Sequence, residues 1–119
     1  MAKHNEFGKE AEELACGHLV QSGFEILERN FRFDRAEVDV IARHTDHIIG
    51  VEVKARSTDY FGDPTDFVSD KKIKQLVKAM NHYMVENDLD LEVRFDIIGI
   101  LSTNDGIVIK HIQDAFYFF

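Results

Sequence analysis

Apolar side chains recur along this chain with two different spacings, which divide it into helices and strands. Over residues 7–22 they return every three or four positions, as in an amphipathic helix that covers a core. Gly23 follows at the place where a glycine in the left-handed conformation commonly ends a helix. Residues 24–33 are rich in aromatic and branched side chains and predict a strand, with a bulge between Ile26 and Leu27, where the alternation slips.

The centre of the chain predicts a β-hairpin. Residues 37–41 and 48–54 are two short runs of branched apolar side chains with charged residues between them, and they are joined across residues 43–47. Residues 57–69 then show no period and include glycine, proline and several aspartates. This composition predicts a mobile loop beside the hairpin.

The last third of the chain predicts a second helix and two more strands. Ser69 or Asp70 can cap the helix. Its inward stripe consists of Ile73, Leu76, Val77, Met80, Tyr83 and Met84. Residues 91–101 and 107–112 predict strands, separated by a turn at 104–106. The order of helix, three strands, helix and two strands, without an internal repeat or linker, predicts a single α/β domain over residues 1–119 with flexible ends.

Composition narrows the class of protein. With 119 residues, of which 45% are hydrophobic and 30% charged, the chain has the size and make-up of one packed globular domain. Cys16 is its only cysteine, so neither an internal disulfide nor a cysteine-based zinc cage can form, and a reducing cytoplasm is the predicted location. No stretch approaches the roughly 20 apolar residues that span a bilayer, so we expect no membrane insertion.

Net charge argues against a nucleic-acid partner, but its distribution changes that view. The formal net charge is −8, whereas proteins that bind DNA usually present a basic footprint. Residues 29–78, however, hold 10 of the 14 basic residues against 9 acidic ones, a balance of +1, which leaves −9 for the two ends together. A polyanionic substrate is therefore compatible with this chain.

The two predicted hairpin strands carry their charges on one face. Glu37 and Asp39 share a parity, as do Glu52 and Lys54, and valines take the opposite face. An even-length turn in the middle of the hairpin would pair Asp39 with Glu52, and Glu37 with Lys54. Like charges opposed in this way destabilise a sheet, so a positive group must compensate. One lysine against three carboxylates leaves a surplus that a divalent cation would neutralise.

The chemistry of these side chains favours a hard metal ion. Oxygen ligands select Mg²⁺ or Mn²⁺ over zinc. Such an ion polarises phosphoryl oxygens and acidifies a bound water, while a nearby ammonium holds or activates that water. Asp39, Glu52 and Lys54 can fill these roles in phosphodiester hydrolysis. Glu12, at the margin of the buried stripe of the first helix, is a candidate for a further ligand.

Six motifs follow one another in an order that resembles a known family. They are Gly8-x-x-Ala11-Glu12-x-Leu14-Ala15, Arg29-Asn30-Phe31-Arg32, Ala36-Glu37-Val38-Asp39-Val40-Ile41-Ala42, Val51-Glu52-Val53-Lys54-Ala55-Arg56, Lys71-Lys72 and Arg94-Phe95-Asp96. Asp39 followed by Glu52-Val53-Lys54 resembles the D…(D/E)-x-K signature of restriction-endonuclease-like nucleases. The whole series, from about Gly8 to Phe116, is similar to the YraN-like family of small bacterial predicted endonucleases, which are similar to archaeal Holliday junction resolvases.

The resemblance implies a restriction-endonuclease-like α/β fold, with a mixed five-stranded sheet flanked by helices. It implies that Asp39 and Glu52 bind Mg²⁺ or Mn²⁺, that Lys54 is the catalytic lysine and that Glu12 completes the metal site. Glu37 belongs to the same motif as Asp39 and would support it. The implied substrate is DNA, including branched DNA, with RNA as the less favoured alternative. The residues predicted to contact nucleic acid are Arg29, Arg32, Arg56, Lys71 and Lys72.

Each of these features also has a simpler explanation. Asp39, Glu52 and Lys54 can form a structural ion pair on a half-exposed sheet. Glu12 can be a solvated helix residue, and the lysines of the second helix can be a solvated polar face. The corresponding alternative function is a nucleic-acid-binding module or scaffold without catalysis. The aromatic residues 115–119 can dock on their own core or form a homodimer.

Overall fold

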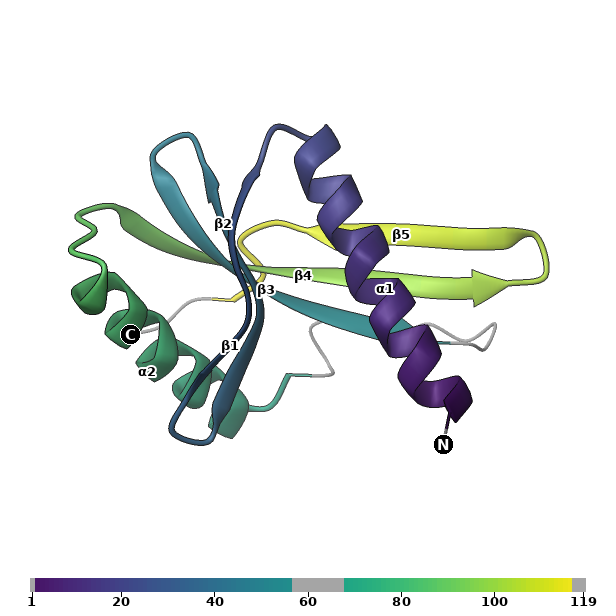
Figure 1. Cartoon of the computed structure of the whole chain (residues 1–119), viewed down its shortest axis with the longest axis horizontal. Coiled ribbons are helices and arrows are strands. Elements are labelled where there is room, and N and C mark those ends of the chain that lie inside the picture. The colour runs from purple at the N-terminus through teal and green to yellow at the C-terminus, as the bar shows by residue number, and fades with distance from the viewer. Residues whose placement is uncertain (1, 57–67, 117–119) are drawn as a thin grey trace.

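The computed structural model describes residues 2–56 and 68–116, with side chains from Phe7 onward. Two helices and a five-stranded sheet make up an α/β fold (Figure 1). In chain order the elements are α1 (Ala2–Gln21), β1 (Glu25–Phe33), β2 (Ala36–His44), β3 (His47–Arg56), α2 (Asp70–Glu86), β4 (Glu92–Thr103) and β5 (Gly106–Ile112). The predicted fold class and element order are confirmed, and the arrangement is consistent with a nuclease-like fold. Within the described residues, no helix has the length and apolar character needed to cross a membrane.

The sheet is mixed, as expected. Its strands lie in the order β1-β2-β3-β4-β5. Neighbouring strands are antiparallel except for β3 and β4, which are parallel. Parallel strands cannot be joined by a tight turn, because the chain must return to the same end of the sheet before the second strand begins. The connection that contains α2 makes this return, and it thereby places α2 against the sheet beside the predicted hairpin.

The two faces of β3 separate two apolar cores. Ile49 and Val51 pack in a cluster with residues of α1, whereas Ile48 packs in the cluster that includes α2. Gly50 lies on the α2 side, where an added Cβ would come within 3.2 Å of Met80 and 3.3 Å of Phe95, so its lack of a side chain lets the helix approach. Because side chains alternate along a strand, the residues that continue this row, Glu52 and Lys54, also face α2.

Local details of the sequence prediction are confirmed where the structure describes them. Gly23 ends the first helix region with φ of +92°, and the register of β1 against β2 shifts between Ile26 and Glu28. Ser69 caps α2, because its side chain accepts a hydrogen bond from the backbone N–H of Lys72. All of the predicted inward stripe of α2 is buried except Ile73, which is partly buried. Most of the predicted mobile loop, residues 57–67, lies outside the described residues.

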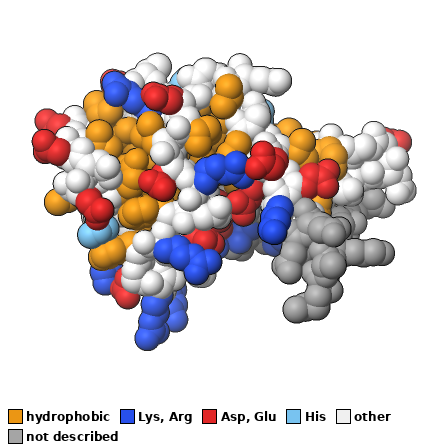
Figure 2. Space-filling view, in the orientation of Figure 1, with side chains coloured by type: hydrophobic (Ala, Val, Ile, Leu, Met, Phe, Trp, Pro, Cys, Tyr) orange, Lys and Arg blue, Asp and Glu red, His pale blue; other side chains and the backbone are white. Residues whose placement is uncertain are grey.

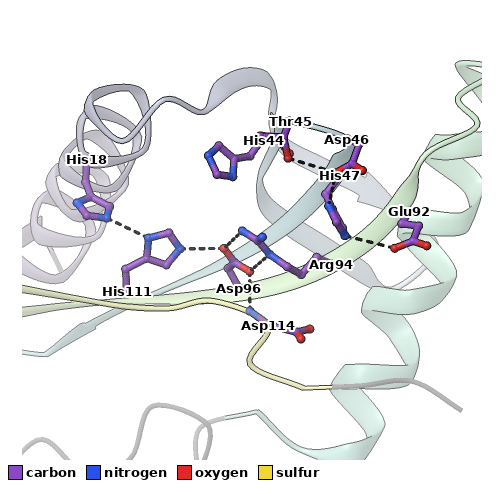
Figure 3. A network of polar contacts seen from close by, with 10 residues as sticks. All are labelled: His18, His44, Thr45, Asp46, His47, Glu92, Arg94, Asp96, His111 and Asp114. Atoms are coloured by element: carbon purple, nitrogen blue, oxygen red, sulfur yellow. Dashed lines mark hydrogen bonds and ion pairs between the residues drawn. The ribbon is translucent and has the colours of Figure 1, made fainter.

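A buried polar network ties α1 to the β4–β5 pair (Figure 3). Asp96 is 0% exposed, and Arg94 donates two hydrogen bonds to it, Nε to Oδ1 at 2.9 Å and a terminal nitrogen to Oδ2 at 3.0 Å. His111 Nε2 lies 2.8 Å from Asp96 Oδ2, and the backbone N–H of Asp114 donates to Oδ1. His111 Nδ1 then lies 3.0 Å from Nε2 of His18 on α1. The network therefore reaches from one buried carboxylate to the helix above the sheet.

The charge on Asp96 is stabilised by these contacts. Burial opposes the charged form, but hydrogen bonds from His111, Arg94 and the backbone of Asp114 outweigh it and hold the pKa of Asp96 below its ordinary value. Burial and the neighbouring His111 lower the pKa of His18, which favours the neutral ring. In the sequence, Asp96 is part of a family motif, but its contact with His111 on β5 and the further contact of His111 with His18 on α1 were not predicted.

Candidate functional site

The hairpin brings the two principal carboxylates to the same end of its ladder. Backbone pairing runs from His44–His47 to Val40–Val51, in the predicted register, and Asp39 and Glu52 come directly after the last pair. The prediction that Asp39 and Glu52 form a ladder pair is wrong. Instead, the Val53 N–H donates a hydrogen bond to Asp39 Oδ2 at 2.8 Å. The carboxylate of Asp39 thus takes the place of a strand acceptor for β3, and β2 can leave β3 without an unsatisfied backbone donor.

Asp39 and Glu52 line one cavity of about 200 Å³ between the hairpin and α2. The cavity is also lined by Arg35, Ala36, Glu37, Lys72, Gln75 and Leu76. Both carboxylates therefore lie on the same side of the sheet, which the metal hypothesis requires. The site combines side chains of β2, β3 and α2 with the turn before β2.

Glu52 is the most buried charged residue of the site. It is 5% exposed, and its Oε1 lies 2.7 Å from Lys72 Nζ and 3.7 Å from Lys54 Nζ. Its other oxygen, Oε2, is buried and has no hydrogen-bond partner among the described residues. An unpartnered buried carboxylate oxygen is costly, so this atom is available to a ligand that brings positive charge.

The protonation equilibria of the site depend on burial and on the short distances between charges. Burial and the charge of Glu52 raise the pKa of Asp39 to about 7, although the hydrogen bond from Val53 opposes the shift. Burial also lowers the pKa of Lys54, with Lys72 adding to the effect against the attraction of Glu52. For Lys72, burial favours the neutral amine, but the hydrogen bond and charge of Glu52 outweigh it and raise the pKa.

Because burial and the charge of Glu52 disfavour the ionised form of Asp39, we expect Asp39→Asn to stabilise the metal-free protein at alkaline pH. The folded pKa of Asp39 lies above its ordinary value of 3.8, so its contribution to stability is full below pH 3.8 and is lost as the pH rises through about 7. Asparagine keeps an acceptor for Val53 and has no charge to lose. We expect a gain in unfolding free energy on the order of 2 kcal/mol at pH 8, shrinking as the pH falls toward 3.8.

Urea unfolding in the presence of a chelator, at several pH values, measures this gain. Asp90→Asn, at an exposed position before β4, is the matched control and should change the unfolding free energy little at any pH. An Asp39→Asn variant that is no more stable than the wild type at pH 8 would contradict the account of the site's electrostatics.

Glu37 does not meet Lys54, in contrast to the prediction from strand register. Its Oε2 accepts a hydrogen bond from Arg32 Nε at 3.0 Å, and the two residues are partners in the β1–β2 ladder. The physical reason is that the β2–β3 ladder ends at Val40–Val51, before Glu37 can come opposite β3. Glu37 lines the cavity from β2, and its supporting role in the site stays a prediction.

Glu12 acts on the site through its charge. It is half-buried on α1, and its charge adds to the rise in the pKa of Asp39. Among the side chains that the structure describes, no three or more carboxylate, histidine or cysteine groups are gathered closely enough to hold a metal ion. The structure brings Asp39 and Glu52 together in one cavity. The role of Glu12 as a third ligand stays a prediction.

The residues present fit a hard divalent cation. The donor atoms are carboxylate oxygens, one of them the buried and unpartnered Oε2 of Glu52. Mg²⁺ is commonly held by one or two protein carboxylates and completes its coordination with waters and substrate phosphate oxygens. Asp39 and Glu52 are therefore sufficient as the protein's share of such a site.

The residues predicted to contact nucleic acid are divided among several environments. Arg29 pairs with Glu13 of α1 at 2.8 Å, Arg32 pairs with Glu37, and an Arg56 guanidinium nitrogen donates to the carbonyl of Ala55. On α2, Lys71 is exposed, whereas Lys72 turns inward to Glu52. The sequence predicted Lys72 as a nucleic-acid contact, with a solvated polar face as the alternative, and it did not predict the pair with Glu52.

The face of the molecule seen in Figure 2 carries both signs of charge. On the face seen in Figure 2, basic and acidic side chains lie beside one another across the middle of the molecule, and apolar side chains gather to one side of them. A surface of this kind attracts phosphates weakly by itself. A cation bound by the carboxylates would shift the local balance toward positive charge.

Comparisons with known proteins place relatives along nearly the whole chain. The uncharacterised protein family UPF0102 matches residues 11–100. A UPF0102 protein of Christiangramia forsetii is 56% identical over 119 residues, which is 100% of both chains. One from Phocaeicola vulgatus is 42% identical over 117 residues, 98% of this chain and 97% of the relative, and one from Persephonella marina is 39% identical over 110 residues, 92% and 91% of the two chains. These names state no activity.

Proposed function

The chain belongs to the UPF0102 family, and from the chemistry of its site we propose that it is a Mg²⁺- or Mn²⁺-dependent endonuclease that hydrolyses phosphodiester bonds in DNA. The observation that carries the proposal is the meeting of Asp39 and Glu52 in one cavity, with Lys54 reaching Glu52 from the same strand. A buried carboxylate beside a half-buried one is costly, and the raised pKa of Asp39 reflects that cost. Proteins keep such arrangements where function requires them.

Each residue has a definite task in the proposed reaction. Asp39 and Glu52 would hold the cation, and the hydrogen bond from Val53 orients the Asp39 carboxylate. When bound, the cation would polarise the scissile phosphoryl group and lower the pKa of a water molecule. Lys54 presents a partly buried ammonium with a lowered pKa, which suits it to hold the attacking water or to stabilise charge on the phosphate.

The proposed substrate is DNA, and branched DNA is among the forms to be tested. The cavity lies beside the turn that precedes β2 and the first turn of α2, whose Lys71 is exposed. Arg35 lines the same cavity. In this proposal, Arg35 and Lys71 would contact phosphates of DNA that approaches a cation at Asp39 and Glu52.

A cleavage assay with purified full-length protein tests the proposal. Covalently closed circular DNA, linear duplex, flap and four-way DNA, and an RNA strand of matched sequence are incubated with Mg²⁺, Mn²⁺ or a chelator. We expect nicking of circular DNA with either metal and none with the chelator, because a closed circle offers no end to an exonuclease. Lys54→Met should lose most of this activity, on the order of 10²-fold.

The outcomes separate the two functions considered. Failure of the wild type to cut any substrate with either metal would overturn the nuclease assignment. If the same protein retained DNA in the chelator without turnover, the alternative of a nucleic-acid-binding module would be supported. Cleavage that is equal in wild type and Lys54→Met would place the reaction at another site.

A further inference from the structure

We propose that Lys72 is an internal counterion that competes with the divalent cation for Glu52, and that cation binding releases Lys72 to contact a DNA phosphate. The inference rests on the proposed function and extends it to how metal and DNA binding are coupled. It begins from one contact, the 2.7 Å pair between Lys72 Nζ and Glu52 Oε1.

The contact joins two residues that lie 20 positions apart in the sequence. Glu52 is on β3 and Lys72 is in the first turn of α2, and residues 57–67 lie between them in the sequence. The backbone of Lys72 is held by the side chain of the capping residue Ser69. The position of its Cα is therefore fixed, while its long side chain can rotate between partners.

Of the two lysines at Glu52, Lys72 is the one whose side chain can more readily leave Glu52 for another partner. Its side chain is 35% exposed and lines the cavity, whereas that of Lys54 is 19% exposed and its ammonium is 3.7 Å from the carboxylate. A cation held by the Glu52 carboxylate would compete for its charge with the shorter and stronger of these two pairs. The freed ammonium would stay on a partly exposed side chain that lines the cavity.

Formal charges show why the exchange favours DNA. Asp39 and Glu52 supply two negative charges and Lys54 and Lys72 two positive ones, so the four groups balance. A divalent cation raises the sum to +2, and a polyanion can neutralise that excess. Metal and DNA should therefore strengthen each other's binding, and part of that coupling should pass through Lys72.

Metal affinity is the first measurement, and it needs no cleavage. Mn²⁺ is titrated into the wild type, Lys72→Met, Lys72→Gln and the control Lys74→Met, whose lysine is exposed on the same helix. Loss of the competitor should tighten Mn²⁺ binding about fivefold or more in both Lys72 variants. The Mn²⁺ affinity of the control should stay close to that of the wild type. The affinity of Lys72→Arg should lie between those of the wild type and the two neutral variants, because arginine keeps a competing positive charge.

DNA affinity is the second measurement. Binding is measured in a chelator and in Ca²⁺, with electrophoresis to show that the DNA stays uncut. In the chelator the wild type and Lys72→Met should bind alike, because Lys72 is engaged by Glu52. In Ca²⁺ the wild type should gain affinity, and Lys72→Met should lose about fivefold or more of that gain.

The outcomes distinguish this inference from the function on which it rests. Mn²⁺ binding that is unchanged or weaker in both Lys72 variants overturns the competition and leaves the nuclease proposal standing. An equal loss of DNA affinity with and without Ca²⁺ shows that Lys72 is only a phosphate contact, and this also overturns it. A wild type that binds no Mn²⁺ overturns both proposals together.

Discussion

Replacing Glu52 by Gln is expected to slow DNA cleavage by on the order of 10²–10³-fold. Glu52 has one oxygen paired with lysines and a second that is buried and unpartnered among the described residues. Glutamine keeps the shape but exchanges one oxygen for an amide that donates hydrogen bonds, and it removes the negative charge. The cation would lose one of its two carboxylate ligands, so both its binding and the polarisation of the phosphate would suffer.

Initial rates of circular-DNA nicking under saturating Mg²⁺ measure this effect, with circular dichroism and thermal unfolding as tests of folding. Glu92→Gln is the matched control, because Glu92 is 85% exposed in its side chain and pairs with His47 at the opposite end of β3. The control should cut DNA at the wild-type rate. A folded Glu52→Gln variant with wild-type activity would remove Glu52 from the proposed mechanism.

The second large effect is expected for Asp96→Asn, which should reduce the unfolding free energy by about 3–5 kcal/mol. Asp96 accepts hydrogen bonds from Arg94, His111 and the backbone of Asp114 and has no exposed surface. An asparagine amide group would face at least one of these donors, and Arg94, which is partly buried, would be left without its counterion. A loss of this size corresponds to a fall of roughly 10–20 °C in Tm.

The pH dependence gives an independent check on Asp96. Because its folded pKa is held below the ordinary 3.8, its stabilising contribution is present above that value and is lost as the pH falls through the lower folded pKa. The difference in unfolding free energy between wild type and Asp96→Asn should therefore be largest near neutral pH and decrease in acid. Asp105→Asn, in the exposed β4–β5 turn, serves as the control. A difference that stays constant down to pH 2 would show that packing, and not charge, is responsible.

The two large effects concern different faces of the sheet. Glu52 lies on the α2 side of β3, and the Asp96 network reaches His18 of α1. We therefore expect Asp96→Asn to lower stability while the rate of cleavage by the folded fraction at low temperature stays close to that of the wild type. Glu52→Gln should have the opposite profile, with activity lost and the fold kept.

The positions of the site residues on the hairpin could be predicted from the alternation of side chains along its strands. The alternation along β3 puts Glu52 and Lys54 on one face, and the even-length turn sets the register that brings Asp39 to the same end of the hairpin. The predicted pairing failed one residue further on, where Asp39 accepts from Val53 and Glu37 pairs with Arg32. Where two strands separate depends on the twist of the sheet and on what packs beside them, which no spacing of residues encodes.

By itself, the sequence determined the order of helices and strands, several of the caps and turns between them, and the shared face of the charged residues Glu52 and Lys54 on β3. These follow from interactions between residues close together in the chain, whose periods and turn preferences can be recognised locally. Only the tertiary structure decided that Lys72 turns inward to Glu52 and that Asp96 meets His111 and, through it, His18. Such contacts join side chains 20, 15 and 93 positions apart, and they form only when helix packing brings distant charged groups into a space where burial forces them to find partners.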